Sequence, residues 1–127
     1  MKPSKLTKLA IAALLFIPMT ASAEYMEVLE QEFKEGCTVT KYQVIIDDFN
    51  KWATDYGYQA KIASPLYSDK FGGSVYWIGT SKDGTTFGAA YDAWLVGLKD
   101  PKSTPAKLDA RFSKCTKLKS RRAYIVN

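Results

Sequence analysis

The sequence predicts a single α+β domain in which a four-stranded antiparallel sheet carries helices on one face. Two long segments repeat apolar side chains at helical spacing, and four others alternate apolar with polar residues or concentrate β-branched and aromatic ones, as strands do. Their order is strand, helix, strand, strand, helix, strand, with a short extra helix before the last strand. This is the split βαβ order of ferredoxin-like folds, which arranges the strands as 4-1-3-2 across the sheet.

Two amphipathic helices are predicted where apolar side chains recur every three or four residues, at 42–56 and at 87–98. We interpret the aromatic residues of the first helix as a core face, and a ligand-contacting stripe is the alternative. Gly57 supplies a left-handed stop after this helix. Helix N-caps are expected at Thr40, at Ser81 or Asp83, and at Thr104.

The strands differ in their expected burial. The first, at 24–33, carries apolar residues on both faces. The second is expected to lie at an edge of the sheet or to end at Pro65, because proline cannot donate to a ladder of backbone hydrogen bonds. The other predicted segments are a second strand at 58–68, a turn at 69–73, a third strand at 74–80, a short helix at 103–115 and a last strand at 117–126.

The first 23 residues have the composition of a secretory signal peptide. Three lysines precede an apolar run of 11 residues, and the small residues at 21–23 form a small-x-small cleavage site. A membrane anchor is the alternative, but an apolar span takes about 20 residues. We expect cleavage before Glu24, a mature domain at 24–127 without a transmembrane segment, and a periplasmic or secreted location.

Two cysteines, Cys37 and Cys115, form one even pair in a chain that we expect to be exported. This predicts one disulfide, with two free thiols as the alternative. In the split βαβ order the end of the first strand lies beside the start of the last. A bridge between positions 37 and 115 is therefore geometrically reasonable.

Charge is distributed unevenly along the mature chain. Without the leader's three lysines, 15 basic and 13 acidic residues remain, which gives no electrostatic case for nucleic-acid binding. Residues 24–98 have a net charge of −5 and residues 99–127 a net charge of +7. The basic end could bind an anionic partner. We favour pairing within the protein, because the predicted topology places the basic last strand beside the acidic first strand.

No histidine occurs in the sequence. This excludes Ser-His-Asp and Cys-His nucleophilic sites, histidine-ligated haem and most zinc sites. Neither a nucleophile elbow nor a phosphate-binding loop is present. Glu30 and Glu32 share a strand face and could form a metal or acid/base site, but a salt-bridged strand edge is the simpler interpretation. We therefore expect no metal and no cofactor, and we assign no catalytic residue.

The chain is rich in aromatic residues, with 17 in total. On the predicted third strand, Val75 and Trp77 occupy one face and Tyr76 and Ile78 the other. Helices on one side of the sheet would leave the second apolar face uncovered. The simplest cover is the same face of a second subunit, so we expect a homodimer through the open sheet face.

The stretch VYWIGTSKDGTTFGAAYDAWLVGLKDP at 75–101 resembles the third strand and second helix of the dimeric α/β-barrel superfamily. The similar elements are an aromatic strand ending at Trp77, a Ser/Asp bend, then FGAAYDA and DP. This superfamily includes antibiotic-biosynthesis-type monooxygenases and NIPSNAP-like proteins. The resemblance implies that two sheets close face to face into a barrel, with a pocket between sheet and helices. Its haem-degrading members use a histidine ligand, which this chain lacks.

These observations lead to a principal hypothesis and two alternatives. The first is a periplasmic or secreted dimer that binds a small apolar or aromatic ligand or a protein partner, with Trp77, Tyr76 and Tyr25 as candidate ligand contacts. The resemblance implies a second, a cofactor-independent monooxygenase-like enzyme, since such enzymes place Asn, Trp and Tyr groups around an aromatic substrate. The third is a protein that binds an anionic envelope surface through unpaired basic residues at 117–122.

Overall fold

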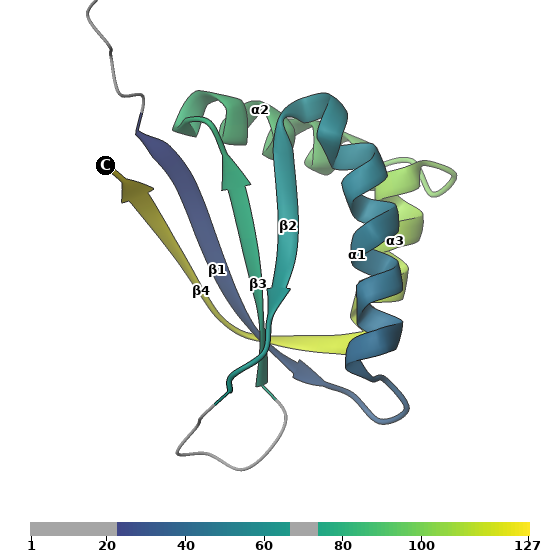
Figure 1. Cartoon of the computed structure of the whole chain (residues 1–127). Helices are drawn as coiled ribbons and strands as arrows, with labels where there is room; N and C mark the ends of the chain where they lie inside the picture. Colours follow the sequence, from purple (N-terminus) through teal and green to yellow (C-terminus); the bar gives the residue numbers. More distant parts are fainter. Residues whose placement is uncertain (1–22, 67–73) are drawn as a thin grey trace, which may run out of the picture.

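The computed structural model describes residues 23–66 and 74–127. The leader, apart from its last residue, and the turn predicted at 69–73 lie outside the described residues. The described part forms one sheet with helices beside it (Figure 1). The elements are β1 (Glu24–Phe33), α1 (Val39–Ala53), the short 3₁₀ helix η1 (Thr54–Tyr56), β2 (Tyr58–Ala63), β3 (Ser74–Ser81), α2 (Gly84–Leu98), α3 (Thr104–Cys115) and β4 (Thr116–Val126).

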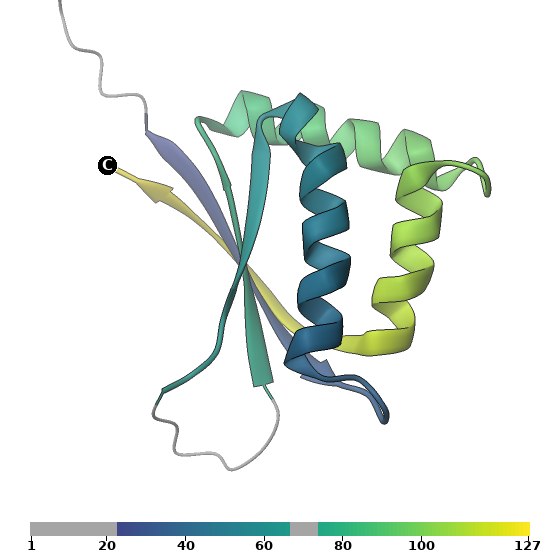
Figure 2. The same ribbon diagram turned by 45° about the vertical axis from the view of Figure 1, so that its right-hand side comes forward.

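The sheet has the strand order that the sequence predicts. Its order is β2-β3-β1-β4, and all neighbouring strands are antiparallel. The helices α1, α2 and α3 lie on one face of this sheet, and α1 and α3 run side by side (Figure 2). The protein therefore has the ferredoxin-like α+β fold, with α3 added before the last strand. As expected from Pro65, β2 is an edge strand, and it ends at Ala63, before this proline and short of the predicted end at 68.

Each of the three α-helices is preceded by a residue with extended backbone whose side-chain oxygen accepts a hydrogen bond from the N–H three residues later. Asp83 fills this role for α2, as predicted. Thr38 rather than Thr40 caps α1, and Ser103 rather than Thr104 caps α3. Thr40 and Thr104 already lie inside their helices. The free N–H groups of the first turn are therefore capped by a residue two positions earlier in α1 and one position earlier in α3.

The core lies between the sheet and the helices. Tyr42 and Ile46 of α1 and Val75 of β3 are its largest fully buried side chains, which confirms the apolar face of α1 as a core face. Because strand residues alternate between faces, the odd-numbered residues of β1 point toward the helices. Two of these are polar: Glu27 and Gln31 are 4% and 9% exposed. The sheet thus brings polar groups into an aromatic layer.

The open face of the sheet carries a strip of partly exposed apolar side chains. Tyr76 and Ile78 of β3 lie on this face, opposite Val75 and Trp77, as the alternation of the sequence predicts. The strip crosses three strands and consists of Met26, Val28, Tyr76, Ile78, Tyr124 and Val126. Tyr124 and Val126 are 42% and 43% exposed.

Opposite charges pair between the first and last strands, as predicted. Lys119 of β4 lies 3.1 Å from Glu32 of β1, and Arg121 lies 2.7 Å from Glu27. An envelope-binding protein of the kind considered above would need these basic residues unpaired, and two of them are paired.

A disulfide joins Cys37 and Cys115, whose Cα atoms are 5.0 Å apart. It links the segment before α1 to the end of α3. Beside it, the Lys34 N–H donates to the Cys115 carbonyl oxygen at 2.9 Å. Among the described residues, no helix is long and apolar enough to cross a membrane.

Candidate ligand-binding site

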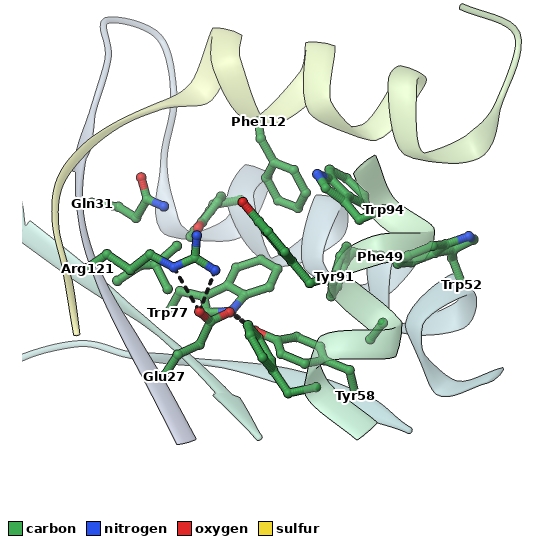
Figure 3. Close-up of a pocket in the computed structure, with 14 residues that line it drawn as sticks. Glu27, Gln31, Phe49, Trp52, Tyr58, Trp77, Tyr91, Trp94, Phe112 and Arg121 are labelled. Carbon is green, nitrogen blue, oxygen red and sulfur yellow. Dashed lines mark hydrogen bonds and ion pairs between the residues drawn. The ribbon is translucent and has the colours of Figure 1, made fainter. Parts of the chain in front are cut away.

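A cavity of about 210 Å³ lies between the sheet and the helices. All of α1, α2, α3 and the four strands contribute to its wall, so the cavity belongs to the core of the fold (Figure 3). Nine of its 14 lining residues are aromatic. The lining consists of Glu27, Leu29, Gln31, Tyr42, Phe49, Trp52, Tyr58, Trp77, Phe87, Ala90, Tyr91, Trp94, Phe112 and Arg121.

Phe49 of α1 contacts several of the other aromatic residues in the cavity wall. Its ring centroid lies 4.8 Å from that of Trp77, 5.6 Å from that of Trp94 and 6.0 Å from that of Phe112. All three contacts are edge-to-face, the arrangement that aromatic quadrupoles favour. Aromatic edges and faces from four elements thus surround the space.

One side of the cavity holds a connected polar network. The Trp77 indole N–H donates to the Tyr58 hydroxyl at 2.7 Å, and this hydroxyl donates to Glu27 Oε1 at 2.6 Å. Arg121 donates to the other carboxylate oxygen, Oε2, from Nε at 3.0 Å and from Nη2 at 2.7 Å. Its guanidinium carbon also lies 5.2 Å from the centre of the Tyr91 ring. Figure 3 shows Arg121 and Tyr58 meeting at the Glu27 carboxylate.

Protonation states within the network follow from burial and charge. Burial raises the pKa of Tyr58, and the neighbouring Glu27 carboxylate raises it further, so the hydroxyl keeps its proton. Burial by itself lowers the pKa of Arg121, but the hydrogen bonds and negative charge of Glu27 outweigh this effect and the net change is upward. The network therefore contains a neutral Tyr58 and a charged Arg121.

Two further polar groups lie in the cavity wall. The amide of Gln31 forms no hydrogen bond with another described side chain, although the residue is 91% removed from solvent. The Tyr42 hydroxyl is buried, and no described group meets it with normal hydrogen-bond geometry. Burial raises the pKa of Tyr42, and the nearby Thr116 side chain offsets only part of this rise. Both groups retain capacity for a hydrogen bond.

The structure separates the three ligand contacts suggested by the sequence. Trp77 lines the cavity. Tyr25 stands behind the wall, where its ring stacks on that of the lining residue Phe87 at 4.1 Å. Tyr76 lies on the open face of the sheet and does not line the cavity. Tyr42 and Phe49 of α1 are core residues and also line the cavity.

Sequence reasoning did not identify Glu27, Tyr58 and Arg121 as a site. The available signal was the position of Glu27 on the same strand face as Tyr25 and Leu29, which should have marked it as a buried carboxylate. Glu30 and Glu32 are the pair considered for a metal. Glu30 accepts hydrogen bonds from the Ser74 and Ser120 hydroxyls, and Glu32 forms an ion pair with Lys119. Within residues 23–66 and 74–127, no cluster of three acidic or cysteine side chains is arranged to hold a metal.

Comparison with known proteins confirms the fold. No protein-family profile and no curated protein matches the sequence. SnoaB, described as a cofactor-independent oxygenase from Streptomyces nogalater, superposes with a TM-score of 0.58 at 10% identity, over 83% of this chain and 94% of SnoaB. The hydroxynitrile lyase of Passiflora edulis superposes with a TM-score of 0.53 at 18% identity, over 84% of this chain and 95% of the lyase. At these identities the likeness concerns the fold alone.

Proposed function

We propose that this protein binds a small aromatic ligand in the cavity between sheet and helices. The observation that carries the proposal is the composition of the cavity wall: nine aromatic residues surround about 210 Å³, and the polar groups are gathered on one side. Ligand sites generally combine such an apolar wall with a few placed polar groups. A cavity of about 150 Å³ lined by apolar side chains is large enough to bind benzene, so this one has room for a substituted single ring.

Filling the cavity tests the proposal. Ala90 faces the cavity from α2 and is 5% exposed, whereas its neighbour Ala89 is exposed. Addition of toluene should shift the NMR signals of the cavity tryptophan Trp77 in the wild type and in Ala89→Leu, but not in Ala90→Leu. Unchanged binding in Ala90→Leu would place the ligand elsewhere, and the lack of any aromatic ligand would remove the proposal.

The proposal includes a homodimer formed through the open sheet face. The apolar strip across β3, β1 and β4, which includes Tyr76 and Ile78, supports the homodimer. An exposed apolar sheet face requires a second layer to cover it. In such a dimer Tyr76 would contact the second subunit rather than the cavity ligand. Native mass spectrometry of the purified mature chain tests the assembly directly.

We also propose that the chain is exported and cleaved before Glu24. The leader composition and the disulfide support this location, because disulfides persist in oxidising compartments. Expression of the full chain in a bacterium, followed by mass measurement of the periplasmic product, should give a chain that begins at Glu24. A cytoplasmic, uncleaved product would contradict the proposed location without affecting the cavity.

The alternative function is a cofactor-independent oxygenase or a related enzyme. Its support is the shared fold with SnoaB, which is described as such an oxygenase, together with the position of Trp77 and Tyr58 in the cavity wall. Oxygen uptake with phenols and quinols tests it, with Trp77→Phe as the comparison. Binding without oxygen uptake would favour the ligand-binding function.

A further inference from the structure

We infer that the ligand is a neutral, single-ring aromatic compound that donates an N–H or O–H hydrogen bond to Glu27 Oε1. This inference rests on the proposed aromatic-ligand function and specifies which aromatic compounds the cavity selects. The direction of the hydrogen bonds around Glu27 carries it.

All the hydrogen bonds of the network run toward Glu27. The Trp77 indole N–H can only donate, and its acceptor is the Tyr58 oxygen. The Tyr58 proton is consequently directed to Glu27 Oε1. The donors of Trp77 and Tyr58 are thus used within the protein, so a ligand that offers only an acceptor gains no partner from these two residues.

The carboxylate of Glu27 has acceptor capacity to spare. An ionised carboxylate can accept about four hydrogen bonds, two on each oxygen. Arg121 gives two N–H groups to Oε2, while Oε1 receives only the Tyr58 hydroxyl. One acceptor position therefore remains on Oε1, in a residue that lines the cavity and is 4% exposed. A donor on the ligand would complete the set.

Charge and size restrict the ligand further. The positive charge of Arg121 balances that of Glu27, so the site offers no net attraction to a cation, and an anion would approach a buried carboxylate. The space of about 210 Å³ accommodates one ring with small substituents. Gln31 offers both a donor and an acceptor, so it does not discriminate between a ligand that donates a hydrogen bond and one that accepts it.

Phenol, toluene and anisole separate this inference from the general aromatic site. Phenol and toluene have the same shape and differ in one hydroxyl, and anisole retains the oxygen without its proton. Binding can be followed by NMR through the indole N–H signal of Trp77, which belongs to the network. We expect phenol to bind about 10- to 100-fold more tightly than toluene or anisole, the usual range for a hydrogen bond to a charged group.

Glu27→Gln should reduce the preference for phenol over toluene to about one, because the amide is a weaker acceptor and one of its positions is a donor. Toluene binding in the same variant reports whether the cavity is intact. Glu30→Gln makes the same chemical change on the opposite face of β1 and should preserve the preference. If Glu27→Gln does not fold, equal binding of phenol and anisole by the wild type still overturns the inference.

Equal binding of phenol, toluene and anisole by the wild type would overturn the inference and leave the aromatic site standing. A preference for phenol over toluene that persists in folded Glu27→Gln would also overturn the inference, because a group other than Glu27 would then accept the hydrogen bond from the phenol hydroxyl. Failure of all three compounds to bind would remove both the inference and the proposed function.

Discussion

Gly79 of β3 lies against the hydroxyl of Tyr58 on the neighbouring strand, so closely that a Cβ atom at position 79 would overlap it. The side-chain nitrogen of Trp77 lies beside the same point. The hydrogen bond between Trp77 and Tyr58 therefore requires glycine at this position. Gly79 does not line the cavity, yet it determines the geometry of the polar network.

Gly79→Ala should destabilise the protein by about 1–3 kcal/mol, because the added methyl group must displace a buried, hydrogen-bonded side chain. Gly88→Ala is the control. A Cβ atom at Gly88 meets nothing within 4 Å, and the residue lies inside α2, so this change should stabilise by about 0.5–1 kcal/mol. Urea unfolding of both variants measures the difference. Equal stability of the two would mean that the Tyr58 hydroxyl can move without cost.

Tyr58→Phe should destabilise the protein at neutral pH by about 1–3 kcal/mol, since Glu27 and Trp77 lose a buried partner. The difference should shrink at alkaline pH. The folded state raises the pKa of Tyr58 above its ordinary value of 10.0, so the stabilising contribution of the protonated hydroxyl is complete below that pH and declines as the pH rises above it. Unfolding free energies of both proteins from pH 8 to about 11 test this sign. A difference that grows with pH would contradict it.

The orientation of Arg121 depends on an irregularity in β4. The register with β1 shifts between Glu30 and Gln31. Phe33 is opposite Thr116, and without the shift the same register would place Arg122 opposite Glu27. With the shift, Arg121 is on the helix side of the sheet and Arg122 on the open side.

Arg121→Ala should therefore cost about 1–3 kcal/mol, since it leaves a buried carboxylate without its cation, although the exposure of the arginine moderates the loss. Arg122→Ala, one residue away, should change stability by less than about 0.5 kcal/mol. Thermal unfolding of the two variants provides the measurement. A larger effect at position 122 would indicate that the register shift is absent in solution.

Much of the fold could be predicted from the sequence because it depends on local patterns. The alternation of β3 and the helical spacing after Tyr42 identify their elements directly, and the element order then fixes the strand order. The pairing of Cys37 with Cys115 follows from that topology. The N-caps of α1 and α3 differ from the predicted positions because several neighbouring Ser and Thr residues have the same capping chemistry.

The candidate site was less predictable because its parts are far apart in the sequence. Glu27 is one of several glutamates in β1, and although it shares a strand face with Tyr25 and Leu29, this alternation does not indicate which side chains it meets. Its partner Arg121 is 94 residues away and adjacent to a second arginine. Only the register shift in β4 determines which arginine reaches the cavity.

Ile78→Glu should convert the proposed dimer into a monomer, since it places a charge in the apolar strip of the open sheet face. Val44→Glu is the matched control: it lies on the outer side of α1, is 52% exposed, and should leave the assembly unchanged. Native mass spectrometry and light scattering at micromolar concentration distinguish the outcomes. A wild type that is monomeric under these conditions would remove the dimer and leave the cavity, which one subunit lines by itself, unaffected.

Replacement of both Cys37 and Cys115 by serine should destabilise the protein by about 4–5 kcal/mol, because the bridge closes a long loop in the unfolded chain. The sequence separation is 78 residues, so the bridge restricts most of the mature domain. Urea unfolding of the double variant, compared with the wild type before and after reduction, measures the loss. The reduced wild type and the double variant should have the same free energy of unfolding.

The bridge also holds the end of α3, which supplies Phe112 to the cavity, so toluene binding should weaken along with stability. Full binding after a large loss of stability would show that packing between α1 and α3 alone positions Phe112.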